Sequence, residues 1–214
     1  MDVELVEGLR KLKTGAMVNL ISVVLVLISV VVLFSSVGMV NPENPQAFLI
    51  AVSAMGSFIA LMVVAVILGI VGFVMYFIAT GHLKRYDSKL SIGRWGMLLQ
   101  VIGLILIFIP LLLLIAIASS RPDATVGGAI FASFGLLFVG GLLIIVGAIL
   151  FGIMLMRLGE DPNVESGFKT AGVIYLIGII LSFIAGAIGE ILGIVTTILI
   201  YMNAKNSLKK LRLS

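Results

Sequence analysis

The chain has 214 residues, of which 61% are hydrophobic and only 11% are charged. A soluble domain carries roughly 25% charged residues, so this composition excludes a domain that folds in water. The net charge is +4, and the absence of cysteine removes disulfides, thiol catalysis and cysteine metal sites. Long apolar runs separate the charges, and a lipid-embedded backbone must satisfy its own hydrogen bonds. We therefore predict an all-α fold, a polytopic transmembrane helical bundle.

Residues 1–13 are predicted to form an amphipathic interfacial helix on the membrane surface. Apolar side chains recur there at helical spacing and make one face: Leu5, Val6, Leu9 and Leu12. Bases that lie off this face are expected to contact lipid headgroups: Arg10, Lys11 and Lys13. The alternative is a frayed polar tail. The basic C-terminal tail is expected to contact headgroups in the same way, through Lys209, Lys210 and Arg212.

Four apolar runs are long enough to cross a membrane: residues 15–40, 47–80, 95–118 and 128–156. The two prolines of residues 41–45 predict a turn between the first two spans, and residues 119–123 predict another after the third. Pro110 predicts a kink in the third span. The fourth span is glycine-rich, and we expect it to be the most centrally packed. Two pairs of small residues spaced by four also suit close helix packing: Ala148 with Gly152 in the fourth span, and Ala65 with Gly69 in the second.

The last apolar run, residues 170–203, crosses either once or twice. Two spans, at about 170–186 and 189–204 with a fold at Gly186–Gly189, place thirteen of the fourteen Lys and Arg residues on one side. One span changes that split to nine against five. Because cytoplasmic loops are enriched in bases, six spans with both termini cytoplasmic are favoured over five. Stripes of small residues and the short length of each half favour one continuous helix instead.

An internal repeat also favours three helical hairpins. The first, third and fifth spans each begin with a base that is followed six residues later by a polar side chain: Asn19, Gln100 and Tyr175. The string Ile-Leu-Gly-Ile-Val of residues 67–71 recurs at residues 191–195. The end of the last run therefore corresponds to the end of the second span, which returns to the basic side.

Polar residues inside the spans are the speculative functional positions. Asn19, Gln100 and Tyr175 could line a polar vestibule, although such residues more often form hydrogen bonds between helices. Glu190, the one ionisable residue in a long apolar run, is either a helix cap beside the turn or an ion or proton site. His82 has no His or Cys companion and is expected in a solvated loop, residues 81–94. We find no catalytic, metal or cofactor motif.

The opening segment Gly8-Leu9-Arg10-Lys11-Leu12, followed by an apolar run, resembles a family of small archaeal multi-pass membrane proteins of unknown function. Those chains similarly end in a Gly-punctuated apolar run and a short polar tail. They often have a proline where this chain has Ala185-Gly186-Ala187. The resemblance covers the whole chain and implies no activity.

These observations predict an uncharacterised multi-pass protein of the cell membrane without enzymatic activity. Its expected role is structural, or interaction within the membrane. The alternative is a small-solute or ion transporter or channel component. The expected partners are membrane lipids, with a homo-oligomer or another membrane protein as further possibilities. Nucleic acid is not expected, because the orientation of the loops explains the basic residues.

Overall fold

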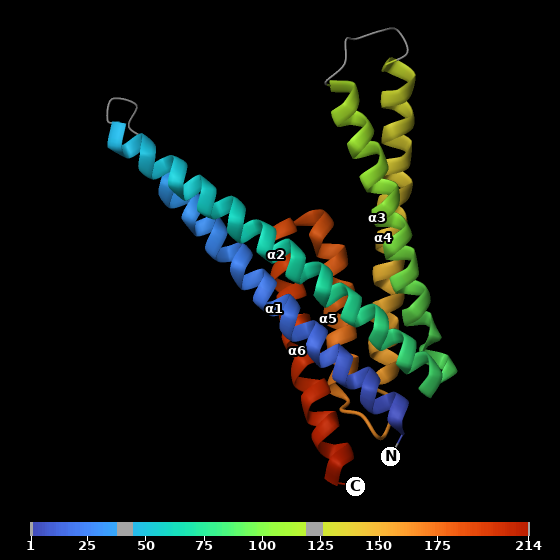
Figure 1. The fold of residues 1–214 in the computed structure, drawn as a ribbon. Coiled ribbons are helices and arrows are strands. Elements are labelled where there is room, and N and C mark those ends of the chain that lie inside the picture. Colours follow the sequence, from blue (N-terminus) through green and yellow to red (C-terminus); the bar gives the residue numbers. More distant parts are fainter. Residues whose placement is uncertain (1, 38–44, 119–125, 214) are drawn as a thin grey trace.

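The computed structural model describes residues 2–37, 45–118 and 126–213, and these residues are helical almost throughout (Figure 1). The elements are α1 (Val3–Val37), α2 (Pro45–Tyr86), the 3-10 turn η1 (Ser88–Leu90), α3 (Ser91–Ala118), α4 (Val126–Leu158), α5 (Gly167–Ile184) and α6 (Gly186–Leu213). All six α-helices are long and apolar enough to cross a membrane. This confirms the predicted all-α transmembrane bundle. The predicted turns at residues 41–44 and 119–123 lie outside the described residues.

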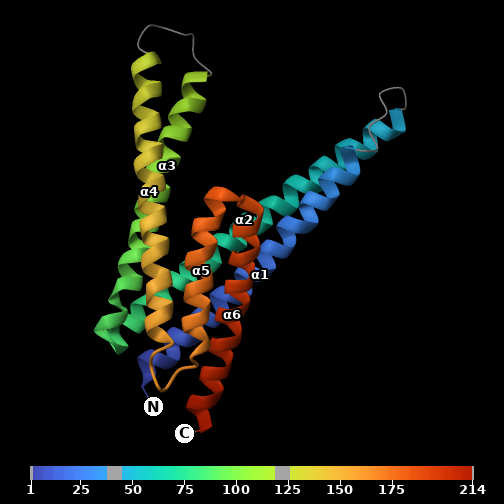
Figure 2. The ribbon, with the colours of Figure 1, turned by 180° about the vertical axis from the view of Figure 1, so that it is seen from behind.

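The helices pack as three hairpins, α1–α2, α3–α4 and α5–α6, as the repeat predicts. Further contacts join α2 to α3, α4 to α5 and α6 to α1, so the six helices form a closed circle. Within the described part of the chain, the backbones of opposite helices do not approach one another closely. Figures 1 and 2 show the short α5–α6 hairpin between the other two, whose far ends diverge. Both chain ends lie at the same end of the bundle, which we call the terminal end (Figure 1).

The last apolar run is two helices, and the chain folds at Ala185 rather than at residues 186–189. Ala185 leaves the helical conformation, with φ −147° and ψ 75°, and its N–H donates to the carbonyl of Leu181. Gly186 already begins α6. Gly189 instead serves packing, since a Cβ there would lie 2.6 Å from the Cα of Ser182 on α5. Part of the stripe of small residues that favoured one continuous helix, namely Gly178, Ser182 and Gly189, thus lies at the contact between α5 and α6.

The predicted interfacial helix is not a separate element, because α1 runs without a break from Val3. Leu5, Leu9 and Leu12 are at most 1% exposed and belong to the main hydrophobic cluster of the protein. The helical spacing was predicted correctly, but the apolar face packs against protein instead of lipid. Spacing alone cannot separate these cases, because both bury one stripe of a helix.

The expected loop at residues 81–94 is also almost entirely helical. Helix α2 continues to Tyr86, and Asp87 caps η1 by accepting a hydrogen bond from the backbone N–H of Lys89. The Tyr86 hydroxyl donates a 2.7 Å hydrogen bond to Asp161, which lies between α4 and α5. The main hydrophobic cluster contains residues from all six helices, among them Leu9, Leu83, Met97, Leu158, Phe168 and Ala204. Its members from α1 and α2 lie where these helices meet the terminal end (Figure 1).

Glycines let neighbouring backbones touch along the circle. Gly96 of α3 faces Gly147 of α4, and a Cβ on Gly96 would lie 2.5 Å from the Gly147 carbonyl oxygen. Gly152 of α4 receives Leu176 of α5, 2.8 Å from where its Cβ would stand. Among the six candidate spans, the one in α4 has the largest buried share, in line with its predicted central position. Helix α3 continues through Pro110.

Candidate functional site

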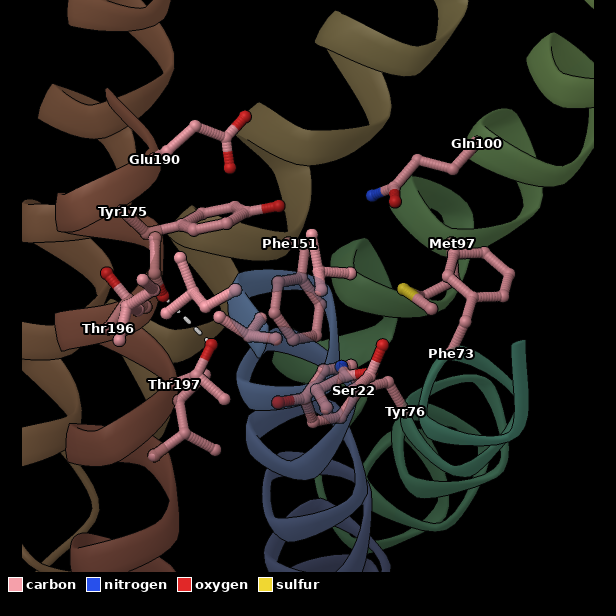
Figure 3. Close-up of a pocket in the computed structure, with 17 residues that line it drawn as sticks. Ser22, Phe73, Tyr76, Met97, Gln100, Phe151, Tyr175, Glu190, Thr196 and Thr197 are labelled. Carbon is pink, nitrogen blue, oxygen red and sulfur yellow. Dashed lines mark hydrogen bonds between the residues drawn. The ribbon is translucent and has the colours of Figure 1, made fainter. Parts of the chain in front are cut away.

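The circle of helices holds a partly open cavity of about 710 Å³, whose lining includes the exposed side chains of Leu27 and Glu190. Small-molecule sites usually measure roughly 300–1,000 Å³, so this cavity has room for a small solute. Each helix contributes at least one lining residue, as Figure 3 shows for Ser22, Tyr76, Gln100, Phe151, Tyr175 and Glu190. The lining is mostly apolar and carries a few polar groups, which is the usual make-up of a binding pocket.

All four polar positions that the sequence singled out line this one cavity: Asn19, Gln100, Tyr175 and Glu190. The three repeat-matched residues come from α1, α3 and α5, the first helix of each hairpin. Their common depth within corresponding helices brings them together at the centre of the circle. Of the two interpretations given above for these residues, this arrangement has the geometry of a polar vestibule, which was the less favoured one.

Three buried polar atoms of the lining have no hydrogen-bond partner among the described residues: Tyr76 Oη, Gln100 Nε2 and Thr196 Oγ1. Thr196 is 1% exposed and Tyr76 is 8% exposed. The side chain of Asn19 on α1 lies beside the Tyr76 hydroxyl. A buried polar group without a partner costs about 1–3 kcal/mol. Water or a solute inside the cavity would remove that cost.

Other hydroxyls of the lining are already engaged. Ser22 donates a 2.7 Å hydrogen bond to the carbonyl of Ala65, which joins α1 to α2. Thr197 donates a 2.9 Å bond to the carbonyl of Gly193 on its own helix, drawn as the dashed line in Figure 3. The lining thus contains both hydroxyls that have a hydrogen-bond partner in the protein and buried polar atoms that have none.

Three aromatic rings from three helices follow one another along the lining. The ring centres of Tyr76 and Phe151 are 5.6 Å apart, and those of Phe151 and Tyr175 are 5.8 Å apart at 78°. The first pair is tilted at 42° and the second is edge-to-face, and packed aromatic pairs add stability beyond the area they bury. The cavity therefore has a packed aromatic side built by α2, α4 and α5.

Glu190 is the fifth residue of α6, and the first turn of that helix contains no acidic residue. A capping carboxylate acts at the N-cap or within the first turn. The structure thus places Glu190 beyond the position of a cap and within the lining of the cavity. Its carboxylate points into the cavity in Figure 3.

His82 lies within α2, not in a loop, and its Nδ1 is 2.6 Å from Glu4 on α1. Arg85 is 3.5 Å from the other oxygen of Glu4. This cluster joins α1 to α2 at the terminal end and is separate from the cavity. The residues expected to contact lipid headgroups belong to the first turns of α1 and the last turns of α6, and such contact remains a prediction.

Sequence reasoning missed Tyr76, Phe151 and Thr196, because each looks like an ordinary member of an apolar run. One signal could have found Tyr76. It follows the start of the first Ile-Leu-Gly-Ile-Val string by nine residues, as Ile200 follows the start of the second, and both line the cavity. The repeat thus marks cavity positions on the returning helices as well.

Comparison with known proteins gives a family but no activity. No curated protein and no solved structure was found to match the chain. Residues 5–214 match DUF973, described as a protein of unknown function. The match leaves the archaeal origin suggested by the resemblance as a prediction. Because it spans nearly the whole described bundle, including every residue of the cavity, the chain belongs to the family DUF973.

Proposed function

We propose that the chain is a non-enzymatic transporter or channel component that binds a small solute in the central cavity. One observation carries the proposal: three residues of a cavity lined by all six helices, Tyr76, Gln100 and Thr196, each have a buried polar atom without a partner among the described residues. A purely structural or interaction role would not require these atoms, since apolar side chains of the same shape would pack without the cost of burying them.

The arrangement of the helices supports movement of the solute. The three hairpins contact one another around the cavity, and α1–α2 and α3–α4 diverge away from the terminal end (Figure 1). Transporters commonly place a solute site between repeated units that rock against each other. We propose that the terminal end faces the cytoplasm, since it contains thirteen of the fourteen bases in a six-span arrangement.

Flux into liposomes tests the proposal. The purified full-length protein is reconstituted, and uptake is measured for a panel of labelled amines, alcohols, carboxylates, sugars and monovalent ions. We expect saturable uptake of at least one solute above protein-free liposomes. Tyr76→Phe and Thr196→Val should each lower the apparent affinity several-fold, since each hydroxyl is worth about 1 kcal/mol to its ligand.

Ser57→Ala is the matched control, because the exposed Ser57 hydroxyl bonds only to its own helix at Ser53 and lies outside the cavity. It should leave uptake unchanged. If the protein neither bound nor moved any solute of the panel, the structural role would replace this proposal.

A further inference from the structure

We propose that the solute is a small organic cation, for which Glu190 is the counter-ion and Tyr76, Phe151 and Tyr175 form an aromatic cage. This inference rests on the proposed function and adds the chemical class of the ligand. It begins from the charge of the cavity, which a bound molecule would have to balance.

Among the described residues that line the cavity, Glu190 is the only charged one, and no Lys, Arg or His lines it. The next base along α6 is Lys205, fifteen residues or about 22 Å away. Glu190 is itself exposed, and the residues that follow it on the same face of α6 are Gly193, Ile194 and Thr197. A cation that comes close to an ionised carboxylate in partly apolar surroundings stabilises it. The described lining supplies no cation, and a cationic ligand would do so.

The aromatic side of the cavity suits the same ligand. The face of an aromatic ring attracts a cation, and sites for quaternary ammonium groups are built from several such rings. Tyr76, Phe151 and Tyr175 form a continuous series with centre-to-centre distances of 5.6 and 5.8 Å. Tyr175 and Glu190 both point into the cavity from neighbouring helices, which places ring and carboxylate at one site (Figure 3).

The size of the cavity favours an organic cation over a metal ion as the ligand. A monatomic cation needs a close shell of oxygen ligands at about 2–2.6 Å. A cavity of about 710 Å³ with mostly apolar walls does not offer such a shell. Alkyl or aryl groups on the cation would fill the apolar part. The unpartnered Tyr76, Gln100 and Thr196 groups would bond a polar substituent.

Calorimetry on the full-length protein in lipid nanodiscs tests this inference with choline and its neutral isostere 3,3-dimethylbutan-1-ol. Empty nanodiscs serve as the blank. We expect choline to bind about tenfold more tightly than the isostere or better, since one cation–π contact and one ion pair distinguish them. Glu190→Gln should reduce that preference several-fold, to the part that the aromatic rings supply, and leave binding of the isostere unchanged. Glu160→Gln, an exposed acid outside the cavity, should change neither affinity.

Tyr175→Leu gives a second measurement that is independent of the carboxylate. It should weaken choline several-fold more than the isostere, because it removes a ring and retains apolar volume. Equal affinities for choline and the isostere, or a Glu190→Gln variant that prefers choline as strongly as the unchanged protein does, would overturn the cation assignment while the solute-binding function stands. Binding of neither probe, with no uptake of any solute, would overturn both proposals.

Discussion

Gly103 on α3 and Gly140 on α4 lie backbone against backbone. A Cβ on Gly103 would stand 2.6 Å from the carbonyl oxygen of Gly140, and a Cβ on Gly140 would stand 2.8 Å from that of Gly103. Gly141, the next residue, has open space where its Cβ would be. These neighbours therefore form a matched pair for testing how closely the two helices pack.

Gly140→Ala should destabilise the protein by about 1–3 kcal/mol, because the clash is with backbone that cannot move aside cheaply. Gly141→Ala should be neutral or stabilise by up to about 1 kcal/mol, since Ala is the better helix former. Melting temperatures in one detergent measure the difference. Equal melting temperatures for the two variants would mean that α3 and α4 are farther apart than described.

Leu9→Ala should cost about 2–5 kcal/mol, because Leu9 is fully buried among helices. Val3→Ala is the control, since Val3 is 71% exposed near the start of the same helix. Thermal unfolding in detergent distinguishes this packing from the interfacial helix that the sequence predicted. An interfacial helix would lose membrane contact on truncation of Leu9 but would leave the stability of the bundle intact.

Thr196→Val should raise the stability of the solute-free protein by about 1 kcal/mol, since it removes a buried hydroxyl that has no partner. Thr197→Val should not stabilise, because that hydroxyl already bonds to the carbonyl of Gly193. The readout is again the melting temperature, measured after exhaustive dialysis. A loss of stability in Thr196→Val would show that the hydroxyl has a permanent partner, such as a tightly held water.

Single cysteines can be placed freely, because the chain has none of its own. In a six-span protein, Glu160→Cys and Asn206→Cys, both exposed and near the terminal end, should react with a membrane-impermeant maleimide from the same side. Asp123→Cys, in the sequence between the third and fourth spans, should react from the opposite side. Labelling of Glu160→Cys and Asn206→Cys from opposite sides would restore the five-span arrangement.

Much of the fold could be predicted from the sequence, because apolar length and the side on which bases collect are direct consequences of the lipid environment. The ends of the helices could not. Lys84 and Arg85 mark where apolar character ends, yet α2 continues through both. A helix leaving the membrane keeps its own hydrogen bonds, so a change of solvent does not end it.

The candidate site was predictable only in part. Asn19, Gln100 and Tyr175 stood out because a polar side chain in lipid is unusual and because the repeat aligned them. Phe151 did not, since a transmembrane run is apolar on every face and hydropathy does not tell lipid-facing from cavity-facing positions. Only packing between helices far apart in the sequence assigns Phe151 to the cavity.

The helices differ so much in length that they cannot all match the thickness of one hydrocarbon core while standing upright in it. Helix α5 has 18 residues and extends about 27 Å, whereas α2 has 42 residues and extends about 63 Å. To match a hydrocarbon core of about 30 Å, the long helix must tilt, and the bilayer must become thinner beside the short helix. Phe183 and Ile184 at the α5–α6 tip are exposed, and such large apolar side chains suit contact with acyl chains. The acyl-chain length of the host lipid thus becomes a variable that acts directly on the hairpin carrying Glu190.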